Sequence, residues 1–407
     1  MTNSTTERLD SLLDTLTELF PEGGVGLDPG LRPGTQGWRL VPSARNPRLA
    51  VPATVPRAAM SSAIRPCASD GLLHKARRYA LAAVLRTPVA DRLMTAGITT
   101  GQFSGSIAEH LHQVFSQPVC FGLMTGSARA NRKPVLGIFD LDGRELGFAK
   151  IGLSSLAADL VSNEHLALSA MNSVRGQGIQ VPQIISFGSW ADRPVLVMSA
   201  LRPNAIQKPL ELPVDAARAI ISSAPVTTCT LSDSHWYNAI VQQLDQLATV
   251  PEAQRLVAMV SRLARHEPDR ILAFGAWHGD FGAWNMARTT SAPMVWDWER
   301  YARHLPLGLD LYHFSAHDHL RQTGNMPVAL RALAGTEVRR TVNNLHQQHG
   351  GDALSGPGGS LVPLLYLATI AARFIEDGHR QRVTATFELG RWHLEVMHEL
   401  LRNTYKG

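Results

Sequence analysis

The stretch AWHGDFGAWNMARTTSAPMVWDWERYA, residues 276–302, sets a histidine, an amide and several carboxylates among large apolar side chains. Moving such polar groups out of water is costly unless they are paired. Apolar runs on either side of the turn-forming segment TTSAPM predict a strand, a loop, a second strand, a turn and a third strand. This order would bring Asp280, Asn285 and Asp297 together in one cleft.

The three side chains of this cleft suit magnesium-dependent chemistry. Asn285 and Asp297 offer two oxygen ligands of the kind that Mg2+ prefers, and the ion keeps water and phosphate in its remaining positions. Asp280 stands apart as a base that could orient a substrate hydroxyl. The alternative is that Asp280 and Asn285 cap turns while Asp297 pairs with a nearby arginine. That alternative explains any one residue more simply, but it does not explain all of them in this order and spacing.

Lys150 ends the predicted strand LGFAKI, where it follows Phe148 and precedes Ile151. An ammonium group in this apolar setting needs an anionic partner. A predicted helix over residues 154–174 offers Glu164, which falls on the same stripe as the apolar residues of that helix. We therefore expect an ion pair between Lys150 and Glu164. The alternative is a partly solvated lysine and a glutamate at the edge of the stripe.

Short apolar runs from residue 118 onward predict an antiparallel sheet. The turn signal Asp142-Gly143 lies between two apolar runs and predicts a hairpin over residues 134–152. Together with the runs PVCFGLMTG, QIISFGSW and PVLVMSAL, this hairpin gives a five-stranded antiparallel sheet with one helix. After residue 203 the pattern becomes mainly helical. The predicted fold class is therefore α+β.

Residues 1–115 precede this arrangement as a small accessory α+β lobe that shows no recognisable chemistry. Its predicted elements are a helix over residues 1–20, two short strands within 38–53 and a helix over 71–87. We expect this lobe to pack on the strand lobe that follows it and stabilise it, or to narrow the entrance to the site. The predicted domains are an accessory lobe, a strand lobe and a helical lobe, at residues 1–115, 116–202 and 203–407.

The order of a strand lysine, a helix glutamate, the motif HGDFGAWN and a strand with DWE resembles the aminoglycoside phosphotransferase and choline kinase family, which has the two-lobed protein-kinase-like fold. Gly279 stands where protein kinases carry arginine, and Trp298-Glu299 replace Phe-Gly, which points to the small-molecule branch. Asp310 in LPLGLDLYHF would brace the catalytic loop. The resemblance covers about residues 118–400 and leaves the accessory lobe outside.

This resemblance implies ATP and Mg2+ as cofactors, a strand lobe that binds the nucleotide and a helical lobe for catalysis and substrate. Asp280 would be the catalytic base, and Asn285 and Asp297 would hold Mg2+. Lys150 would hold the α- and β-phosphates, and Glu164 would hold Lys150. The segment TGSARANRK, which has one glycine, would cover the phosphates, and Met198–Ala200 would form the hinge that meets adenine. The remaining implied nucleotide contacts are therefore Ser127, Arg129, Met198, Ser199 and Ala200.

These residues predict a phosphotransferase that moves the γ-phosphate of ATP to a hydroxyl of a small molecule, such as a sugar, an amino alcohol or an antibiotic. The alternative is a pseudokinase-like nucleotide-binding or regulatory module without transfer activity. Such a module would usually have lost one of the four matched residues Lys150, Asp280, Asn285 and Asp297. A protein kinase is disfavoured because no A-P-E segment follows Asp297, and a dehydrogenase because no strand leads into G-x-G-x-x-G.

The acceptor is left open by the sequence. Aminoglycosides are polycations that favour an acidic cleft, whereas the formal net charge of the chain is +5. We expect the acceptor to bind against the helices after residue 309, next to Asp280. The carboxylates available in those predicted helices are Asp318, Glu376, Asp377 and Glu388.

The segment YHFSAHDHL, residues 312–320, places His313, His317 and Asp318 at helical spacing, which invites a metal-site interpretation. A metal site is the weaker interpretation, because the chain has no HExxH motif and the segment directly follows Asp310. His346 and His349 are expected to be solvated.

The remaining composition limits partners and location. The basic residues form no run, so nucleic-acid binding is not expected. The 3 cysteines lie far apart, and the first residues contain no apolar signal segment, which predicts a cytoplasmic protein with reduced thiols. The apolar run at 361–375 is too short to span a membrane and predicts a buried helix. The oligomeric state is left open.

Overall fold

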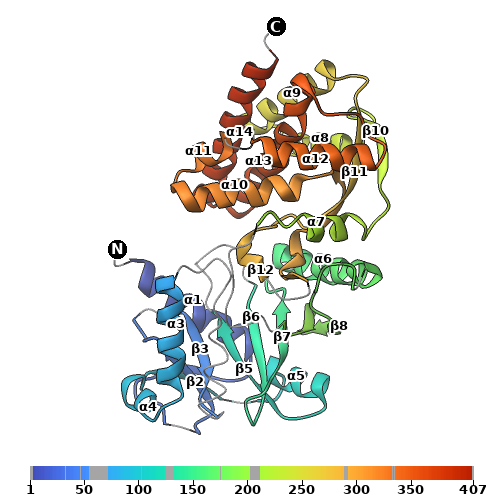
Figure 1. Ribbon diagram of the computed structural model, residues 1–407. Helices are drawn as coiled ribbons and strands as arrows, with labels where there is room; N and C mark the ends of the chain where they lie inside the picture. Colours follow the sequence, from blue (N-terminus) through green and yellow to red (C-terminus); the bar gives the residue numbers. More distant parts are fainter. Residues whose placement is uncertain are drawn as a thin grey trace. The chain divides into compact units, whose positions relative to one another are not determined.

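The computed structural model describes residues 3–405, apart from a set of short segments within that range. The chain divides into two compact units, which we call the strand unit, Met1–Ser169 with Val181–Ile206, and the helical unit, Ala170–Gln180 with Gln207–Gly407. Figure 1 shows the elements of both units in chain order. The segments that the structure does not describe are residues 33, 46, 55–71, 102, 125–132, 175, 202–210, 288–291, 332 and 334.

The described part of the strand unit contains a nine-stranded sheet in which every pair of neighbouring strands is antiparallel. Its order is β1-β4-β2-β3-β5-β6-β7-β9-β8. The strands are β1 (Val25–Asp28), β2 (Gly37–Val41), β3 (Leu49–Pro52), β4 (Gly97–Thr100), β5 (Val119–Met124), β6 (Val135–Asp140), β7 (Glu145–Ile151), β8 (Ile184–Trp190) and β9 (Arg193–Ser199).

The five strands expected from the sequence are β5 to β9, and the structure extends them with four more. β3 pairs with β5 through Leu49–Met124 and Ala50–Leu123, so strands from both sides of residue 115 share one sheet. All residues of β3 are buried, which is typical of a strand inside a sheet rather than at its edge. The predicted domain boundary at residue 115 stays a prediction.

The first helix, α1 (Asn3–Leu19), joins the same core. Phe20 packs edge-on against Trp38, with ring centroids 5.3 Å apart, and the Trp38 indole N–H donates to the Phe121 carbonyl oxygen at 2.7 Å. The accessory segment thus packs on the strands that follow it, as expected. The other helices of this unit are α3 (Leu72–Leu85), α4 (Val89–Leu93), α5 (Ile107–Phe115) and α6 (Ser155–Met171), the last of which crosses into the helical unit.

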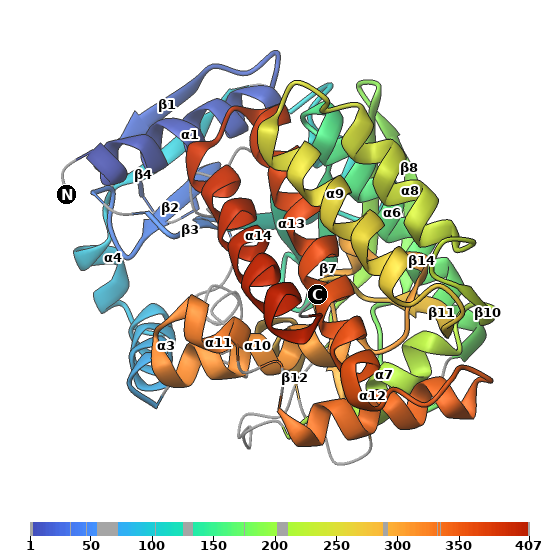
Figure 2. The ribbon, with the colours of Figure 1, turned by 90° about the horizontal axis from the view of Figure 1, so that it is seen from above.

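The helical unit is built around α13 (Leu361–Gln381), the buried helix that the apolar run predicts. Figures 1 and 2 both show α14 (Thr384–Thr404) lying alongside it. The stretch Gly358–Gln381 is long and apolar enough to cross a membrane, but 78% of its most apolar window is buried inside the protein, as in a core helix. A side chain at Gly378 would meet the Phe387 backbone nitrogen at 2.6 Å, so the two helices approach closely only because this residue is glycine.

Shorter elements complete this unit and position the site. β11 (Ile271–Trp277) lies between β10 (Thr227–Thr230) and β14 (Ala302–Pro306), and β12 (Met286–Ala287) pairs with β13 (Met294–Val295). The remaining helices are α7 (Val214–Ile221), α8 (His235–Asp245), α9 (Pro251–His266), α10 (Leu309–Thr323), α11 (Met326–Arg331) and α12 (Thr336–Gln348), with short 3-10 turns η1 (Asn172–Val174), η2 (Ala283–Asn285), η3 (Trp298–Arg300) and η5 (Gly356–Ser360). The α+β class is confirmed by the strands and helices of the two units.

Candidate active site

In the strand unit, Lys150 and Glu164 form the expected ion pair. Lys150 Nζ donates to Glu164 Oε1 at 2.7 Å, and the exposed fractions of the two residues are 6% and 0%. The strand β7 brings the lysine inward and the helix α6 brings the glutamate to meet it. The helix phase used in the prediction is therefore right, since Glu164 lies on the buried face of α6.

The proposed hinge residues lie at the end of β9. Met198 faces Phe148 across the sheet, and the backbone N–H of Ser199 donates to the Gln183 carbonyl oxygen at 2.8 Å. Ala200 lies just beyond the strand and makes no backbone hydrogen bond to any residue that the structure describes. The N–H and C=O of Ala200 therefore have no backbone partner within the described part of the chain. Ser127 and Arg129 lie outside the described residues.

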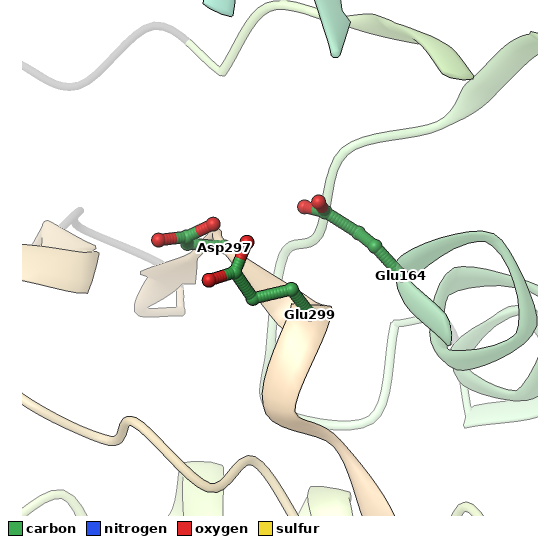
Figure 3. A group of neighbouring side chains, drawn as sticks. All are labelled: Glu164, Asp297 and Glu299. Carbon is green, nitrogen blue, oxygen red and sulfur yellow. The ribbon is translucent and has the colours of Figure 1, made fainter. Parts of the chain in front are cut away.

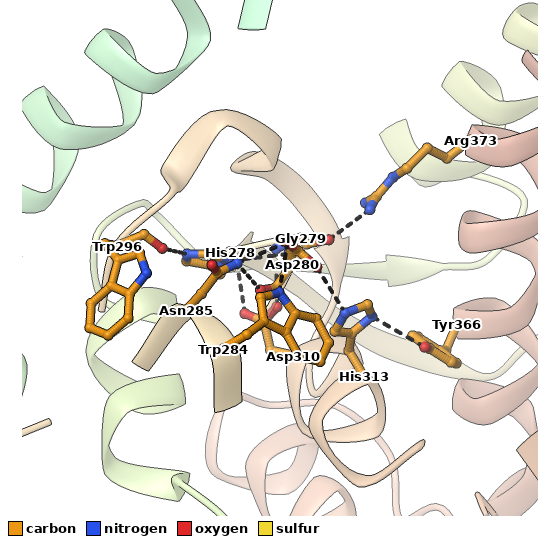
Figure 4. A network of polar contacts seen from close by, with 10 residues as sticks. All are labelled: His278, Gly279, Asp280, Trp284, Asn285, Trp296, Asp310, His313, Tyr366 and Arg373. Atoms are coloured by element: carbon orange, nitrogen blue, oxygen red, sulfur yellow. Dashed lines mark hydrogen bonds and ion pairs between the residues drawn. The ribbon is translucent and has the colours of Figure 1, made fainter. Parts of the chain in front are cut away.

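In the helical unit, Asp310 holds the loop that follows β11. The backbone N–H groups of His278 and Gly279 donate to the two oxygens of its carboxylate at 2.7 Å and 3.1 Å (Figure 4). Burial raises the pKa of Asp310 to about 7, against the lowering effect of these two hydrogen bonds. The bracing contact that the sequence predicts for Asp310 is present.

His278 connects this loop to the segment before Asp297. Its Nδ1 accepts the Asp280 backbone N–H at 3.2 Å, so the ring proton lies on Nε2, which donates to the Trp296 carbonyl oxygen at 3.1 Å (Figure 4). Burial lowers the pKa of His278 to about 4 and keeps the ring neutral. The ring also packs edge-on against the buried Trp298, with centroids 4.6 Å apart.

Asp280 is the centre of a hydrogen-bond network. Its Oδ2 accepts from the Asn285 amide at 2.8 Å and from the Trp284 indole at 3.2 Å, and its Oδ1 lies 3.3 Å from His313 Nε2. Burial would raise the pKa of Asp280, but His313, His278 and Trp284 together hold it below the usual range of an aspartate. The side chain keeps an exposed fraction of 33%, so an ionised oxygen remains open to a ligand.

The orientation of Asn285 is fixed by Asp280. Its amide nitrogen donates to the Asp280 carbonyl oxygen at 2.9 Å as well as to the carboxylate, which uses both amide hydrogens. No described residue donates to its Oδ1. The oxygen that a metal ion would need is therefore the atom that the protein leaves available.

Asp297 is placed by the β12–β13 hairpin. Met286 faces Val295 in this hairpin. The Trp296 N–H donates to the Asn285 carbonyl oxygen at 3.0 Å, and Asp297 is the residue that follows Trp296. Asp297 has φ 67° and ψ 61°, a left-handed conformation that is costly for a residue other than glycine and clusters at functional sites. The expected return strand covers Met294–Val295 and ends before Asp297.

Glu299 adds a carboxylate that the sequence interpretation missed. Figure 3 shows it beside Asp297, and their closest ligand oxygens lie within 4.8 Å of one another. The pair offers oxygen ligands of the kind that a divalent cation takes. Glu164, also drawn in Figure 3, belongs to the strand unit. The sequence signal was the DWE motif itself, in which Glu299 served only as a family marker.

The contact between Gly279 and Arg373 is another feature of the site that the sequence does not reveal. Gly279 has φ +82°, and a Cβ there would lie 2.2 Å from the Arg300 carbonyl oxygen, so only glycine fits. The Arg373 guanidinium donates to the Gly279 carbonyl oxygen at 2.7 Å and lies 5.1 Å from the centre of the Trp277 ring. Burial and the nearby Arg300 lower the pKa of Arg373 to about 10. An arginine inside the apolar run of α13 was the one available signal.

His313 contacts the carboxylate of Asp280. Since an ionised carboxylate only accepts hydrogen bonds, Nε2 of His313 must donate to Asp280, and Nδ1 accepts from the Tyr366 hydroxyl at 3.2 Å (Figure 4). Among the described residues, the histidines and aspartate of α10 form no group of three that could hold a metal ion. The metal-site interpretation of this helix is therefore not supported.

No family model and no curated protein matches the chain. Among solved structures, a thermostable mutant of aminoglycoside phosphotransferase APH(4)-Ia with ADP and hygromycin B has TM-score 0.47 and 13% identity, over 74% of this chain and 99% of that one. The amicoumacin kinase hAmiN with AMP-PNP, Ca2+ and Ami has TM-score 0.43 and 14% identity, over 73% and 95%. The GDP and kanamycin complex of APH(2")-IIia has TM-score 0.42 and 14% identity, over 74% and 99%.

These neighbours are small-molecule kinases, the class that the sequence resembles.

Proposed function

We propose that the chain is a cytoplasmic phosphotransferase that uses ATP and Mg2+ and moves the γ-phosphate of ATP to a hydroxyl of a small molecule. The strand unit would bind the nucleotide, and the helical unit would carry the base and the acceptor. The observation that carries this proposal is the fixed amide of Asn285. Its nitrogen is bound twice by Asp280, so its oxygen is directed to a ligand. One contact thus orients a candidate base and a candidate metal ligand together.

On the nucleotide side, Lys150 would neutralise the α- and β-phosphates, and Glu164 would hold the lysine in the extended position this requires. Met198, Ser199 and Ala200 would meet adenine, with the free backbone groups of Ala200 as the main polar contacts. Ser127 and Arg129 would contact the phosphates from the loop above them. Phosphoryl transfer needs this kind of charge neutralisation and positioning far more than covalent help from the protein.

On the metal side, the donor set fits Mg2+. Asn285 Oδ1 and the Asp297 carboxylate are the two proposed ligands, and Glu299 is a third oxygen donor, beside Asp297. When bound, Mg2+ would neutralise charge on the phosphate oxygens. The β12–β13 hairpin would keep the two ligands in register, because Trp296 and Asn285 are tied by a backbone hydrogen bond.

At the reacting hydroxyl, Asp280 would accept a hydrogen bond from the acceptor and orient it in line with the γ-phosphate. Its lowered pKa makes it a weak base, so it would take the proton late, as the new O–P bond forms. A loose transition state tolerates such a weak base, since the hydroxyl needs orientation more than early deprotonation. His313 would keep the carboxylate in the rotamer that faces the acceptor.

The test is metal-dependent nucleotide binding, measured by isothermal titration of ATP with and without Mg2+. The wild-type chain should bind ATP more tightly with Mg2+ than without it, and Asp297→Ala and Asn285→Ala should lose this Mg2+ dependence. Asp318→Asn is the control, because Asp318 lies on α10 and is bound by Gln322. Unchanged Mg2+ dependence in Asp297→Ala would refute the assignment of Asp297 as a metal ligand. The pseudokinase alternative predicts nucleotide binding without transfer to any acceptor.

A further inference from the structure

Trp284 and His313 both contact Asp280, and the ring of His317 packs against both of them. We call these three rings the ring surface. The centroids of Trp284 and His317 are 4.7 Å apart at 80°, and those of His313 and His317 are 4.4 Å apart. The Trp284 indole N–H also binds the Asp280 carboxylate, as Figure 4 shows, so the rings and the proposed base form one connected group. Trp284 and His317 are half-buried and keep part of their surface open.

The ring surface is uncharged at its open end. Burial, with a smaller effect of His313, lowers the pKa of His317 to about 3, so its ring is neutral at physiological pH. Neither ring nitrogen of His317 has a hydrogen-bond partner among the residues that the structure describes. A neutral imidazole has one donor and one acceptor, so His317 can offer a ligand both.

The four carboxylates expected from the sequence as candidates for binding a cationic acceptor each have a partner of their own. Asp377 binds Arg300 at 2.7 Å, Glu376 accepts from Gln243 at 2.6 Å, and Asp318 and Glu388 accept from Gln322 at 2.7 Å and Arg391 at 3.0 Å. They lie on three different helices. The residues of this unit outside the described ranges include no aspartate or glutamate.

Asp310 is the carboxylate nearest to Asp280 along the network, and both of its oxygens accept backbone N–H groups of the loop. Asp297 and Glu299 are the carboxylates proposed to bind the metal ion, so they are not counted as partners of the acceptor. A ligand with several ammonium groups would therefore lose its hydration on this surface without gaining, apart from Asp280 itself, one carboxylate for each charge, which is unfavourable. An uncharged ring with an apolar face would instead bury that face against aromatic side chains, the usual lining of small-molecule sites.

Building on the function proposed above, we propose that the acceptor is an uncharged, ring-bearing alcohol that lies on the Trp284–His317 surface with its hydroxyl at Asp280, and that polycationic aminoglycosides are poor acceptors. His317 would hydrogen-bond a second hydroxyl of this ligand and so select among neutral acceptors. His317 is thus a specificity-determining residue, whereas His313 is a positioning residue for Asp280.

The experiment compares two sets of acceptors at equal concentration with Mg2+ and ATP: neutral glycosides such as methyl and aryl glucopyranosides, and polycations such as kanamycin and hygromycin B. Phosphorylated product is detected by mass spectrometry, and kcat and KM are measured for the best acceptor. We expect the best acceptor to be neutral. We also expect His317→Ala to raise its KM about tenfold with a smaller change in kcat, the loss of one ring contact.

Two further variants separate this role from a structural one. His317→Phe keeps the ring and should retain most of the affinity for a monohydroxy ring acceptor. His319→Gln is the matched control on the same helix, because His319 binds the Ser315 carbonyl oxygen of its own helix, and it should leave KM unchanged. The inference is overturned if the best acceptor is a polycation, if no neutral compound is phosphorylated, or if His317→Ala leaves KM unchanged. If the wild-type chain shows no Mg2+-dependent binding of ATP, the proposed function itself is rejected.

Discussion

The two units solve the problem of buried charge in different ways. In the strand unit, Lys150 meets one carboxylate, Glu164, and both side chains are buried. In the helical unit, Asp280 accepts hydrogen bonds from several donors, the indole of Trp284, the amide of Asn285 and the imidazole of His313. The first arrangement balances charge with charge, whereas the second distributes one charge over several hydrogen bonds.

Because of this difference, mutations in the two arrangements should affect different properties, stability in one and turnover in the other. Removing one partner of a buried ion pair leaves the other charge buried without compensation, so the free energy of unfolding should fall. Removing one donor from a network leaves the others in place, so the cost falls mainly on the geometry of the carboxylate. Loss of the Lys150–Glu164 pair should therefore lower mainly stability, whereas changes to the donors around Asp280 should lower mainly turnover.

The largest effect on stability is expected for Lys150→Met. The variant leaves Glu164 buried without its cation, and the free energy of unfolding should fall by about 3–5 kcal/mol. The double variant Lys150→Met with Glu164→Leu should recover most of this loss but not nucleotide binding. Urea unfolding checks both, with Arg193→Met as the control, since its 3.1 Å pair with Glu18 is partly exposed. A Lys150→Met variant as stable as wild type would show that the pair is solvated.

Acid should destabilise the helical unit, because burial lowers the pKa of His278, His346 and His393. His346 accepts the Ala273 N–H at 3.1 Å through Nδ1, and burial lowers its pKa from 6.5 to about 4. A lowered pKa means that its contribution to stability is fully present above pH 6.5 and is lost as pH falls to 4, by up to about 3 kcal/mol.

The matching variant is His346→Asn, which keeps an acceptor but does not titrate. Its unfolding free energy should fall less between pH 6.5 and 4 than that of the wild-type chain. His349→Asn, at an exposed position, should follow the wild-type curve. Equal pH slopes for His346→Asn and the wild type would contradict the neutral, buried assignment.

Gly279→Ala tests how tightly the loop that carries Asp280 is held against Arg300. Gly324→Ala is its matched control, because Gly324 also has a positive φ, +66°, but no atom within 4 Å of the added Cβ. Both variants incur the left-handed strain, while only Gly279→Ala meets the Arg300 carbonyl oxygen. Thermal or urea unfolding should show Gly279→Ala less stable than Gly324→Ala by about 1–3 kcal/mol. Equal losses would mean that the loop moves freely away from Arg300.

The smallest effect is expected for Tyr366→Phe, which tests how far the network around Asp280 extends. The variant removes the 3.2 Å hydrogen bond to His313 and should cost about 0.5–1.5 kcal/mol of stability, with a modest fall in kcat. Tyr312→Phe is the control, a second buried tyrosine on the neighbouring helix α10. If both variants lower kcat equally, the effect comes from packing and not from His313.

The sequence could predict contacts that follow from periodicity and from short-range order. The Lys150–Glu164 pair followed from one strand and one helix stripe, and the Asn285–Asp297 hairpin from a turn between apolar runs. It could not predict contacts that depend on packing between distant helices. Arg373, on α13, and the His313–Tyr366 contact are of this kind, since no local pattern marks which helix faces the loop.

Two expectations changed for physical reasons. His346 was expected to be solvated but has no exposed surface, because its ring bonds to the Ala273 N–H and the Leu307 carbonyl oxygen. Two backbone partners offset the cost of burying the ring, and periodicity does not report them. The predicted five strands became part of a nine-stranded sheet, because the short strands at 25–52 and 97–100 carry no signal for the strand that they will pair with.

The role of Asp280 as the catalytic base is tested by Asp280→Asn. The variant keeps the shape of the side chain but removes its charge, so Mg2+-dependent ATP affinity should stay near that of the wild-type chain. Phosphoryl transfer to the best acceptor should fall by about 10²–10⁴-fold. Both are measured on the same preparation, by titration and by product formation. Wild-type turnover in Asp280→Asn would contradict the account, because Asp280 would then be a turn residue and not the base.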